Sequence, residues 1–341
     1  MLMKKLVTLI LVLAGMVSSA SADDLYLHNY NDTWGSYPTF TNEGVNSSGE
    51  TVWSYVLNST TGLNSDDFYF RLKYSDYDKD LKPWGDDDYT FNFDDANTNQ
   101  TYTINQKDGD KVFGSNNAFC INHSKYKASE YKITVYAKKG TVYYVKAEIL
   151  KMPVTIGSTG VATFSCTHAL DFTGTGITAN IITEANKATG VLTKVAKTQV
   201  PANTGLFLEG SAGTVEVPVL VSADAIAGNM LVAGPGTTVN PTYGDYTNFI
   251  LTTNNGASAT PKFFKVNSEG NEVAKGKAYL QILTTELNAR SFFWFEDETT
   301  AIEAVKQEIK ANGEFFNLAG QRVAQPTKGL YIVNGKKVIM K

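Results

Sequence analysis

Residues 130–149 read EYKITVYAKKGTVYYVKAEI, and this stretch decides the fold. Apolar residues alternate with lysine, threonine and tyrosine on both sides of Lys139–Gly140, which is the period of a strand with one buried face. A glycine-containing turn between two such runs is typical of an antiparallel hairpin. The pattern predicts a buried set and an outward set of side chains: Tyr131, Ile133, Val135, Ala137, Tyr143, Val145, Ala147 and Ile149 inside, Lys132, Tyr136, Tyr144 and Lys146 outside.

The same period recurs upstream in FYFRLKYSDYDKDLKPWGDDDYTFNF, residues 68–93. Its flanks, 68–74 and 89–93, predict two strands, whereas the acidic loop from Asp76 to Asp88 cannot join a core. Glycine, threonine, asparagine and tyrosine are plentiful in the 341 residues, and helix formers are sparse. We therefore expect an all-β protein with an N-terminal Ig-like β-sandwich, a second β-rich domain and a short C-terminal antiparallel unit.

The chain begins with a segment that we expect to lie outside the fold. Lys4 and Lys5 precede an apolar run at 6–17, and Ala20-Ser21-Ala22 follows it. This is the layout of a secretory signal peptide, so residues 1–22 are predicted to be removed and the protein to be secreted or displayed on the cell surface. No later apolar stretch approaches the roughly 20 residues of a transmembrane helix, so we expect none in the mature chain.

Changes in composition divide the remaining chain into segments. Proline interrupts the strand pattern at Lys151–Pro153, which predicts a linker there. The expected segments are a β-sandwich at 23–150, a spacer-like second β-domain at 151–298, a helical linker at 299–313 and a hairpin unit with an Asn334–Gly335 turn at 314–341. Short strands are predicted within the second domain at 161–164, 177–182, 191–195, 205–208, 215–221, 249–252, 263–266 and 279–282.

Several motifs resemble known families of exported bacterial proteins. A leading LYL run, Trp34-Gly35, the FYFRLKY strand, a Pro-Trp-Gly loop and the terminal hairpin resemble the starch-binding β-sandwich modules of Bacteroidetes glycan-utilisation surface proteins. This resemblance covers residues 23–150 and implies non-catalytic polysaccharide binding, although the loops here are richer in aspartate. The runs VTIGSTGVATFSCTHALDF and SFFWFED resemble a repeat domain of secreted Bacteroidales proteins, which implies no activity.

Residues 314–341 resemble the C-terminal sorting domain of type IX secretion substrates. That resemblance implies the secretion machinery as a partner and attachment of the protein to the cell surface. The alternative is that the segment is a structural end-cap.

The acidic loop and a second polar loop carry the candidate sugar-binding residues. Flat aromatic rings cover the C–H face of a sugar, while charged and polar side chains bind its hydroxyl groups. The predicted site consists of Trp34, Tyr37, Tyr77, Trp84, Asp76, Asp78, Asp80, Lys82 and Asp86, with Arg71, Tyr89 and Asn92 as further contributors. We expect Trp53, by contrast, to fill the sandwich core.

A calcium site is a weaker prediction for the same loop. Asp76, Asp78 and Asp80 have the spacing that begins a calcium loop, and Asp87 falls at its twelfth position. Position six is Leu81 where the motif requires glycine, so a solvated acidic loop is favoured and no cofactor is required.

The two cysteines and three histidines suggest no metal site. Cys120 and Cys166 either form a disulfide or are two small buried side chains. Zinc is disfavoured, because no CxxC spacing is present and the histidines His28, His123 and His168 are scattered.

Other classes of function fit the sequence less well. The letters GxGxxA at 174–179 match a dinucleotide fingerprint, but strand-like text follows where a helix must begin. A formal net charge of -4 without a basic stripe argues against nucleic acid. A glycoside hydrolase needs two carboxylates in a cleft, and an exposed acidic loop keeps them all ionised. We therefore predict a non-catalytic protein that binds a polysaccharide or oligosaccharide, with a structural or adhesive surface protein as the alternative.

Overall fold

The protein is described by a computed structural model. It describes residues 25–28, 38–74, 89–94, 99–104, 118–138, 142–253, 260–287, 290–295, 315–317, 320–324, 326–333 and 336–340. Within these ranges nearly every regular element is a strand, and the helical elements are α1 (His123–Tyr126) and the 3-10 helix η1 (Thr284–Glu286). The predicted all-β class is confirmed. The predicted signal peptide and the helical linker lie outside the described residues.

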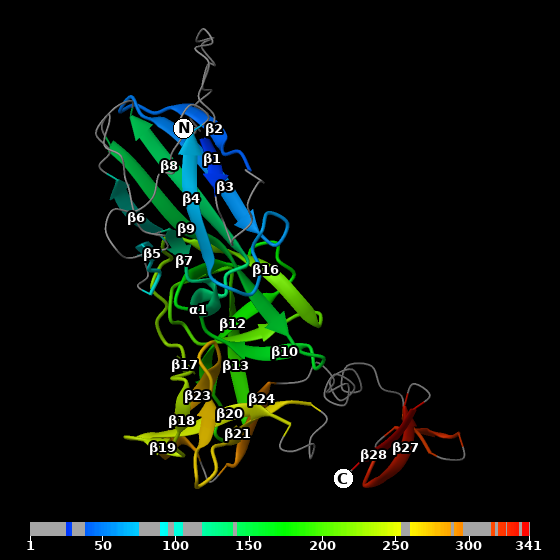
Figure 1. Ribbon diagram of the computed structural model, residues 1–341. Helices are drawn as coiled ribbons and strands as arrows, with labels where there is room; N and C mark the ends of the chain where they lie inside the picture. Colours follow the sequence, from blue (N-terminus) through cyan, green and yellow to red (C-terminus); the bar gives the residue numbers. More distant parts are fainter. Residues whose placement is uncertain are drawn as a thin grey trace, which may run out of the picture.

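Two sheets form the N-terminal β-sandwich (Figure 1). The first has the order β1 (Leu25–His28), β4 (Phe68–Tyr74), β7 (Phe119–Ile121), β5 (Tyr89–Phe91). The second contains β2 (Thr41–Val45), β3 (Thr51–Asn58), β8 (Glu130–Lys138) and β9 (Val142–Ile156), with β6 (Asn99–Ile104) also on β9. One hydrophobic cluster takes side chains from both sheets, which makes them the two layers of a sandwich.

The alternation seen in the sequence decides which side chains enter this core. Phe68, Phe70 and Leu72 of β4 are fully buried, whereas Tyr69 between them is 41% exposed. Trp53 is only 3% exposed, as predicted. In the β8–β9 hairpin the predicted inward residues described at side-chain level are all buried, and Lys132, Tyr136, Tyr144 and Lys146 are partly exposed. Cys120, in β7, and Cys166 do not form a disulfide with each other.

Strand β9 continues through the position where the sequence predicted a linker. It runs without a break from Val142 to Ile156, so the linker prediction for Lys151–Pro153 is wrong. β8 begins at Glu130, which pairs with Lys151, and beyond that point β9 pairs with β16 (Gly213–Leu220) on its other edge. Pro153 therefore lies where one edge of the strand has no partner among the described residues, a position that tolerates proline.

The second part of the chain forms a large sheet of ten strands. It also adds strands to the second sheet of the sandwich, which has eight strands in all. The large sheet has the order β10 (Val161–Phe164), β15 (Leu206–Glu209), β12 (Thr178–Ala185), β13 (Val191–Lys197), β24 (Phe292–Phe295), β21 (Lys262–Lys265), β20 (Tyr246–Thr252), β23 (Ala278–Leu283), β17 (Leu231–Ala233), with β19 (Thr242–Tyr243) on β20. Strands β11 (Ala169–Asp171) and β14 (Gln199–Val200) extend the eight-stranded sheet beyond β16. Each strand predicted in this part has a counterpart in the structure.

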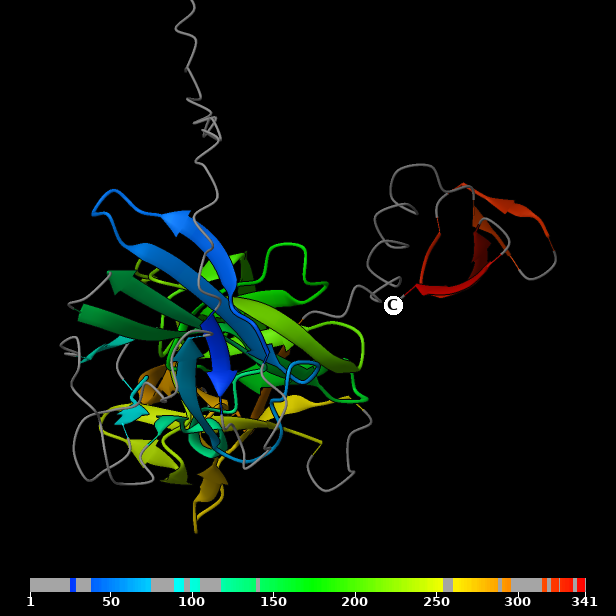
Figure 2. The same cartoon turned by 45° about the horizontal axis from the view of Figure 1, so that its top comes forward.

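Two smaller sheets complete the fold. β18 (Thr237–Val239) pairs with β22 (Asn271–Val273), and their valines pack on Ile250 and Tyr279 of the large sheet. At the C-terminus the order is β26 (Arg322–Val323), β25 (Phe315–Phe316), β27 (Gly329–Val333), β28 (Lys336–Met340). Val333 pairs with Lys336, as the predicted hairpin requires, although the turn residues lie outside the described ones. Figures 1 and 2 both draw this sheet apart from the others.

Candidate functional site

The sequence-predicted site cannot be placed, because all nine of its main residues lie outside the described part of the chain. They are Trp34, Tyr37, Tyr77, Trp84, Asp76, Asp78, Asp80, Lys82 and Asp86, and the calcium candidate Asp87 lies outside it too. The structure does fix both ends of the acidic loop. The loop leaves β4 after Tyr74 and returns at Tyr89, and both β4 and β5 pair with β7.

Two of the further predicted contributors, Tyr89 and Asn92, lie in the described part and make contacts within the fold. The ring of Tyr89 is half-buried and packs edge-on against Phe91 at 5.2 Å between centroids. The side-chain oxygen of Asn92 accepts a 2.5 Å hydrogen bond from the Tyr126 hydroxyl and another from the backbone of Asp94. The bond between Asn92 and Tyr126 holds the chain after β5 against α1, while the Asn92 side chain itself stays exposed.

Charged and aromatic groups lock α1 to the sandwich. Lys125 and Asp94 form a 2.5 Å ion pair, and this hydrogen bond lowers the pKa of the Asp94 carboxyl. Nδ1 of His123 lies 3.1 Å from the hydroxyl of the buried Tyr131, and burial raises the pKa of that tyrosine and lowers the pKa of His123. A site whose polar groups already satisfy one another in this way stabilises the fold and has little capacity left for a ligand.

The most exposed aromatic pair of the described residues lies on the large sheet. Tyr243 of β19 is opposite Tyr246 of β20, and Tyr246 is opposite Leu283 of β23. Residues directly opposite in antiparallel strands share a face, so the three side chains form one row, which we call the tyrosine hairpin. Their side chains are 74%, 41% and 37% exposed, respectively.

The turn of the tyrosine hairpin explains why the row stands clear of the sheet. Only Gly244 and Asp245 separate β19 from β20. Gly244 has a φ of +57°, and no positive φ occurs at Asp245, which is the pattern of a type II′ turn. Such a tight turn leaves no loop residues to fold back over Tyr243 and Tyr246.

Buried polar side chains fix the base of this hairpin. Asn248 is 1% exposed, its Nδ2 donates to the carbonyl of Asn240 at 2.8 Å, and its Oδ1 accepts from Gln281 at 3.1 Å. The Thr284 backbone N–H donates to the carbonyl of Asp245 at 2.8 Å. The two rings are therefore exposed on a rigid support, which reduces the conformational entropy that a ligand must overcome.

The sequence contains a signal for this hairpin. The run PTYGDYTN has tyrosines on both sides of a Gly-Asp pair, and a glycine-containing dipeptide between strand-like residues predicts a two-residue turn. The sequence prediction of sugar-binding rings rests mainly on residues of two polar loops, Trp34 and Trp84 among them, and does not include these tyrosines.

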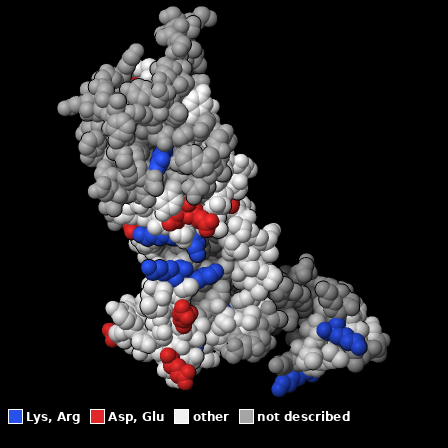
Figure 3. Space-filling model, viewed as in Figure 1, with Lys and Arg blue, Asp and Glu red and all other residues white. Residues whose placement is uncertain are grey.

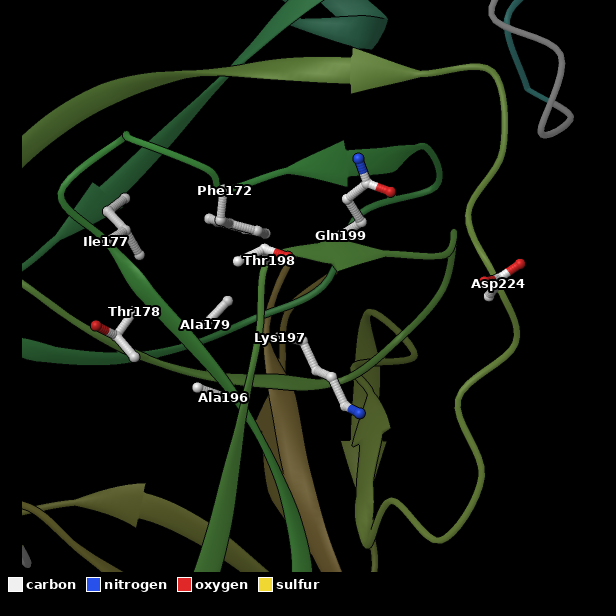
Figure 4. A pocket seen from close by; sticks show the side chains of 9 residues that line it. All are labelled: Phe172, Ile177, Thr178, Ala179, Ala196, Lys197, Thr198, Gln199 and Asp224. Atoms are coloured by element: carbon white, nitrogen blue, oxygen red, sulfur yellow. The ribbon is translucent and has the colours of Figure 1, made fainter. Parts of the chain in front are cut away.

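A pocket of about 380 Å³ lies where the chain passes from one sheet to another (Figure 4). Lys197 pairs with Ala179 in the large sheet, whereas Gln199, two residues later, pairs with Asp171 in the eight-stranded sheet. The lining combines an apolar floor with polar groups: Phe172, Ile177, Thr178, Ala179, Ala196, Lys197, Thr198, Gln199 and Asp224. The GxGxxA letters lead into the strand β12 beside this pocket, as predicted, and not into the helix that a dinucleotide fingerprint requires.

The described residues contain no group of three or more His, Cys, Asp or Glu side chains that could hold a metal ion. Likewise, none of the helices in the described ranges is long and apolar enough to cross a membrane. On the face seen in Figure 3, acidic and basic side chains lie next to each other near the middle of the molecule, so the charge there is mixed.

No protein-family model, curated protein or solved structure matches this chain.

Proposed function

We propose that this protein is a non-catalytic, polysaccharide-binding protein of the cell exterior, and that the tyrosine hairpin is one of its sugar-binding surfaces. The observation that carries the proposal is the rigid, exposed row of Tyr243 and Tyr246. Tyrosine gives a large contact area at low conformational cost and carries a hydroxyl that can bond to sugar hydroxyls.

Polar groups at the hairpin tip suit the same ligand. Asp245 lies in the turn between the two tyrosines, and its side chain is exposed. A carboxylate next to two rings can bind sugar hydroxyls while the rings cover C–H groups. Export is supported by the signal-peptide pattern of residues 1–22.

The acidic loop remains a second proposed surface, centred on Trp84 with Trp34 as its partner ring. Trp84→Ala should weaken retention by glycans without lowering the melting temperature. Loss of folding in that variant would instead place Trp84 in the core.

Native affinity electrophoresis in gels containing starch, xylan or other neutral glycans tests the proposal. Stacking of aromatic groups contributes about 0.5–1.5 kcal/mol, so each tyrosine replaced by alanine should weaken binding about two- to tenfold. Tyr69→Ala is the matched control, because Tyr69 on β4 is as exposed as Tyr246. We expect the Tyr243→Ala, Tyr246→Ala double variant to lose retardation and Tyr69→Ala to keep it.

Two results would count against the proposal. If the wild-type protein is not retarded by any glycan of a broad panel, polysaccharide binding is wrong, and the adhesive alternative is tested by binding to cells. If the double variant is retarded like the wild type, the tyrosine hairpin is not the binding surface.

A further inference from the structure

A second aromatic surface lies on the same large sheet, and it carries positive charge. Phe264 of β21 is opposite Phe292 of β24, and Trp294 is two residues further along β24, so the three rings share a face. The intervening Phe263 and Phe293 point to the other face and are fully buried. Together with Lys262 and Arg290, the three rings form the Trp294 patch, whose five side chains are all half-buried.

The rings of the patch form a continuous row. The centroids of Phe264 and Phe292 are 5.6 Å apart, and those of Phe292 and Trp294 are 5.1 Å apart with ring planes inclined by 27°. Side chains on two paired strands cannot rotate far without clashing with their neighbours, so this arrangement is fixed by the sheet.

Two cations flank Trp294. The Lys262 ammonium lies 5.1 Å from the centroid of the Trp294 ring and 5.2 Å from that of Phe292. Arg290 reaches towards the β12–β13 turn, where its Nε donates to the carbonyl of Lys187 at 2.8 Å and its Nη2 donates to that of Ala188.

Glycine at position 190 makes this approach possible. A Cβ at Gly190 would lie 2.7 Å from Nη1 of Arg290 and 3.4 Å from the Trp294 ring, so both side chains pack directly on its backbone. The guanidinium and the indole are therefore both held against the backbone of Gly190.

Within the described ranges, no salt bridge to a carboxylate neutralises the charge of this patch. Lys194, which lies over Phe295 at 5.0 Å, also forms a 2.5 Å ion pair with Glu209. No carboxylate of the described residues forms such a pair with Lys262 or Arg290. The Trp294 patch thus combines flat apolar rings with cations that can still take an anionic partner.

We propose that the Trp294 patch binds an acidic polysaccharide, with the C–H face of a sugar on the rings and its anionic group on Lys262 and Arg290. An acidic sugar has an apolar face and a charge within one unit, whereas an acidic peptide has the charges without a flat apolar face for each ring. The inference rests on the proposed function for the ligand class, but it adds a separate surface and a preference for charge.

Lys262→Met tests this inference, because methionine keeps an unbranched stem over the rings and removes only the charge. Lys265→Met is the matched control: Lys265 lies on the same strand but on the alternate face, and it is exposed. Affinity electrophoresis uses polygalacturonate for carboxylate, dextran sulfate for sulfate and starch as the neutral glycan. Loss of a charge-assisted contact should weaken binding of Lys262→Met to the acidic probes about tenfold.

We expect Lys262→Met to bind starch as the wild type does, and Lys265→Met to bind every probe unchanged. The stronger of the two acidic probes identifies the anionic group. Retardation of the wild type by starch but by neither acidic glycan overturns this inference alone, whereas no retardation by any glycan overturns the proposed function with it. Equal losses in the two lysine variants, or equally effective competition by polyglutamate, also overturn the inference, since non-specific charge or an acidic protein would then explain the binding.

Discussion

Asn248→Ala removes the polar anchor beneath the tyrosine hairpin and should destabilise it measurably. The substitution deletes the 2.8 Å bond to the Asn240 carbonyl and the 3.1 Å bond from Gln281. Each hydrogen bond contributes about 1 kcal/mol, and a buried partner left unpaired adds about 1–3 kcal/mol. Because Asn248 itself is 1% exposed, we expect a loss of about 3–5 kcal/mol in the free energy of unfolding.

Urea denaturation followed by tryptophan fluorescence measures this loss, because Trp294 lies in the same sheet. Asn240→Ala is the control: the bond from Asn248 goes to the main-chain oxygen of Asn240, which the substitution keeps. We expect that control to cost less than about 0.5 kcal/mol. Asn248→Ala should also weaken glycan retention, because without the Asn248 side chain the base of the tyrosine hairpin is held less rigidly. A cost below about 0.5 kcal/mol for Asn248→Ala, or equal costs for the two variants, would refute the reasoning.

Two further predictions concern stability. Burial lowers the pKa of His168, so the unfolded chain binds a proton more readily; stability should fall as pH drops below about 6.5, the unfolded value, towards the folded pKa. His168→Leu should reduce the difference between the free energies of unfolding that urea titrations give at pH 7 and at pH 5. An unchanged difference would contradict this prediction. Gly234→Ala should cost about 1–3 kcal/mol, because its Cβ would meet the carbonyl of Ala274 and lie 2.9 Å from that of Lys277. Thermal unfolding measures this cost, with Gly157→Ala as the control, because a Cβ at Gly157 has no atom within 4 Å. Equal melting temperatures of the two variants would show that the backbone around Gly234 shifts to accommodate the Cβ.

The strands could be predicted from the sequence because their signal is local. Phe68, Phe70 and Leu72 indicate a buried face by their spacing alone. The Asn334–Gly335 pair alone predicts the C-terminal hairpin, whose strands β27 and β28 do pair. The pairing of distant strands has no such signal. Strand β13 pairs in parallel with β24, and Val191 is opposite Trp294, more than a hundred residues later in the chain. Nothing in the local sequence of either strand specifies that pairing.

The linker prediction failed for a related reason. Proline at 153 was interpreted from the strand's own sequence, but whether a strand tolerates proline depends on which neighbour is present at that edge. Likewise, Tyr89 and Asn92 have the residue types of a sugar site. Yet the ring of Tyr89 packs against Phe91, and the side-chain oxygen of Asn92 accepts a hydrogen bond from Tyr126. Composition identifies groups that can bind a ligand, and only the packing shows which are still available.

The tyrosine hairpin and the Trp294 patch lie on one face of the same sheet. Tyr246 shares its face with Ile250, four residues along β20, and Ile250 is opposite Phe264 of the Trp294 patch. Between the two surfaces, Val239 and Val273 of β18 and β22 cover Ile250 and Tyr279. Because the sheet fixes the separation of the two surfaces, a polysaccharide long enough to cross β18 and β22 can engage both. Binding at the first surface then raises the effective concentration of the chain at the second, which favours long polymers over short oligosaccharides without any additional contact.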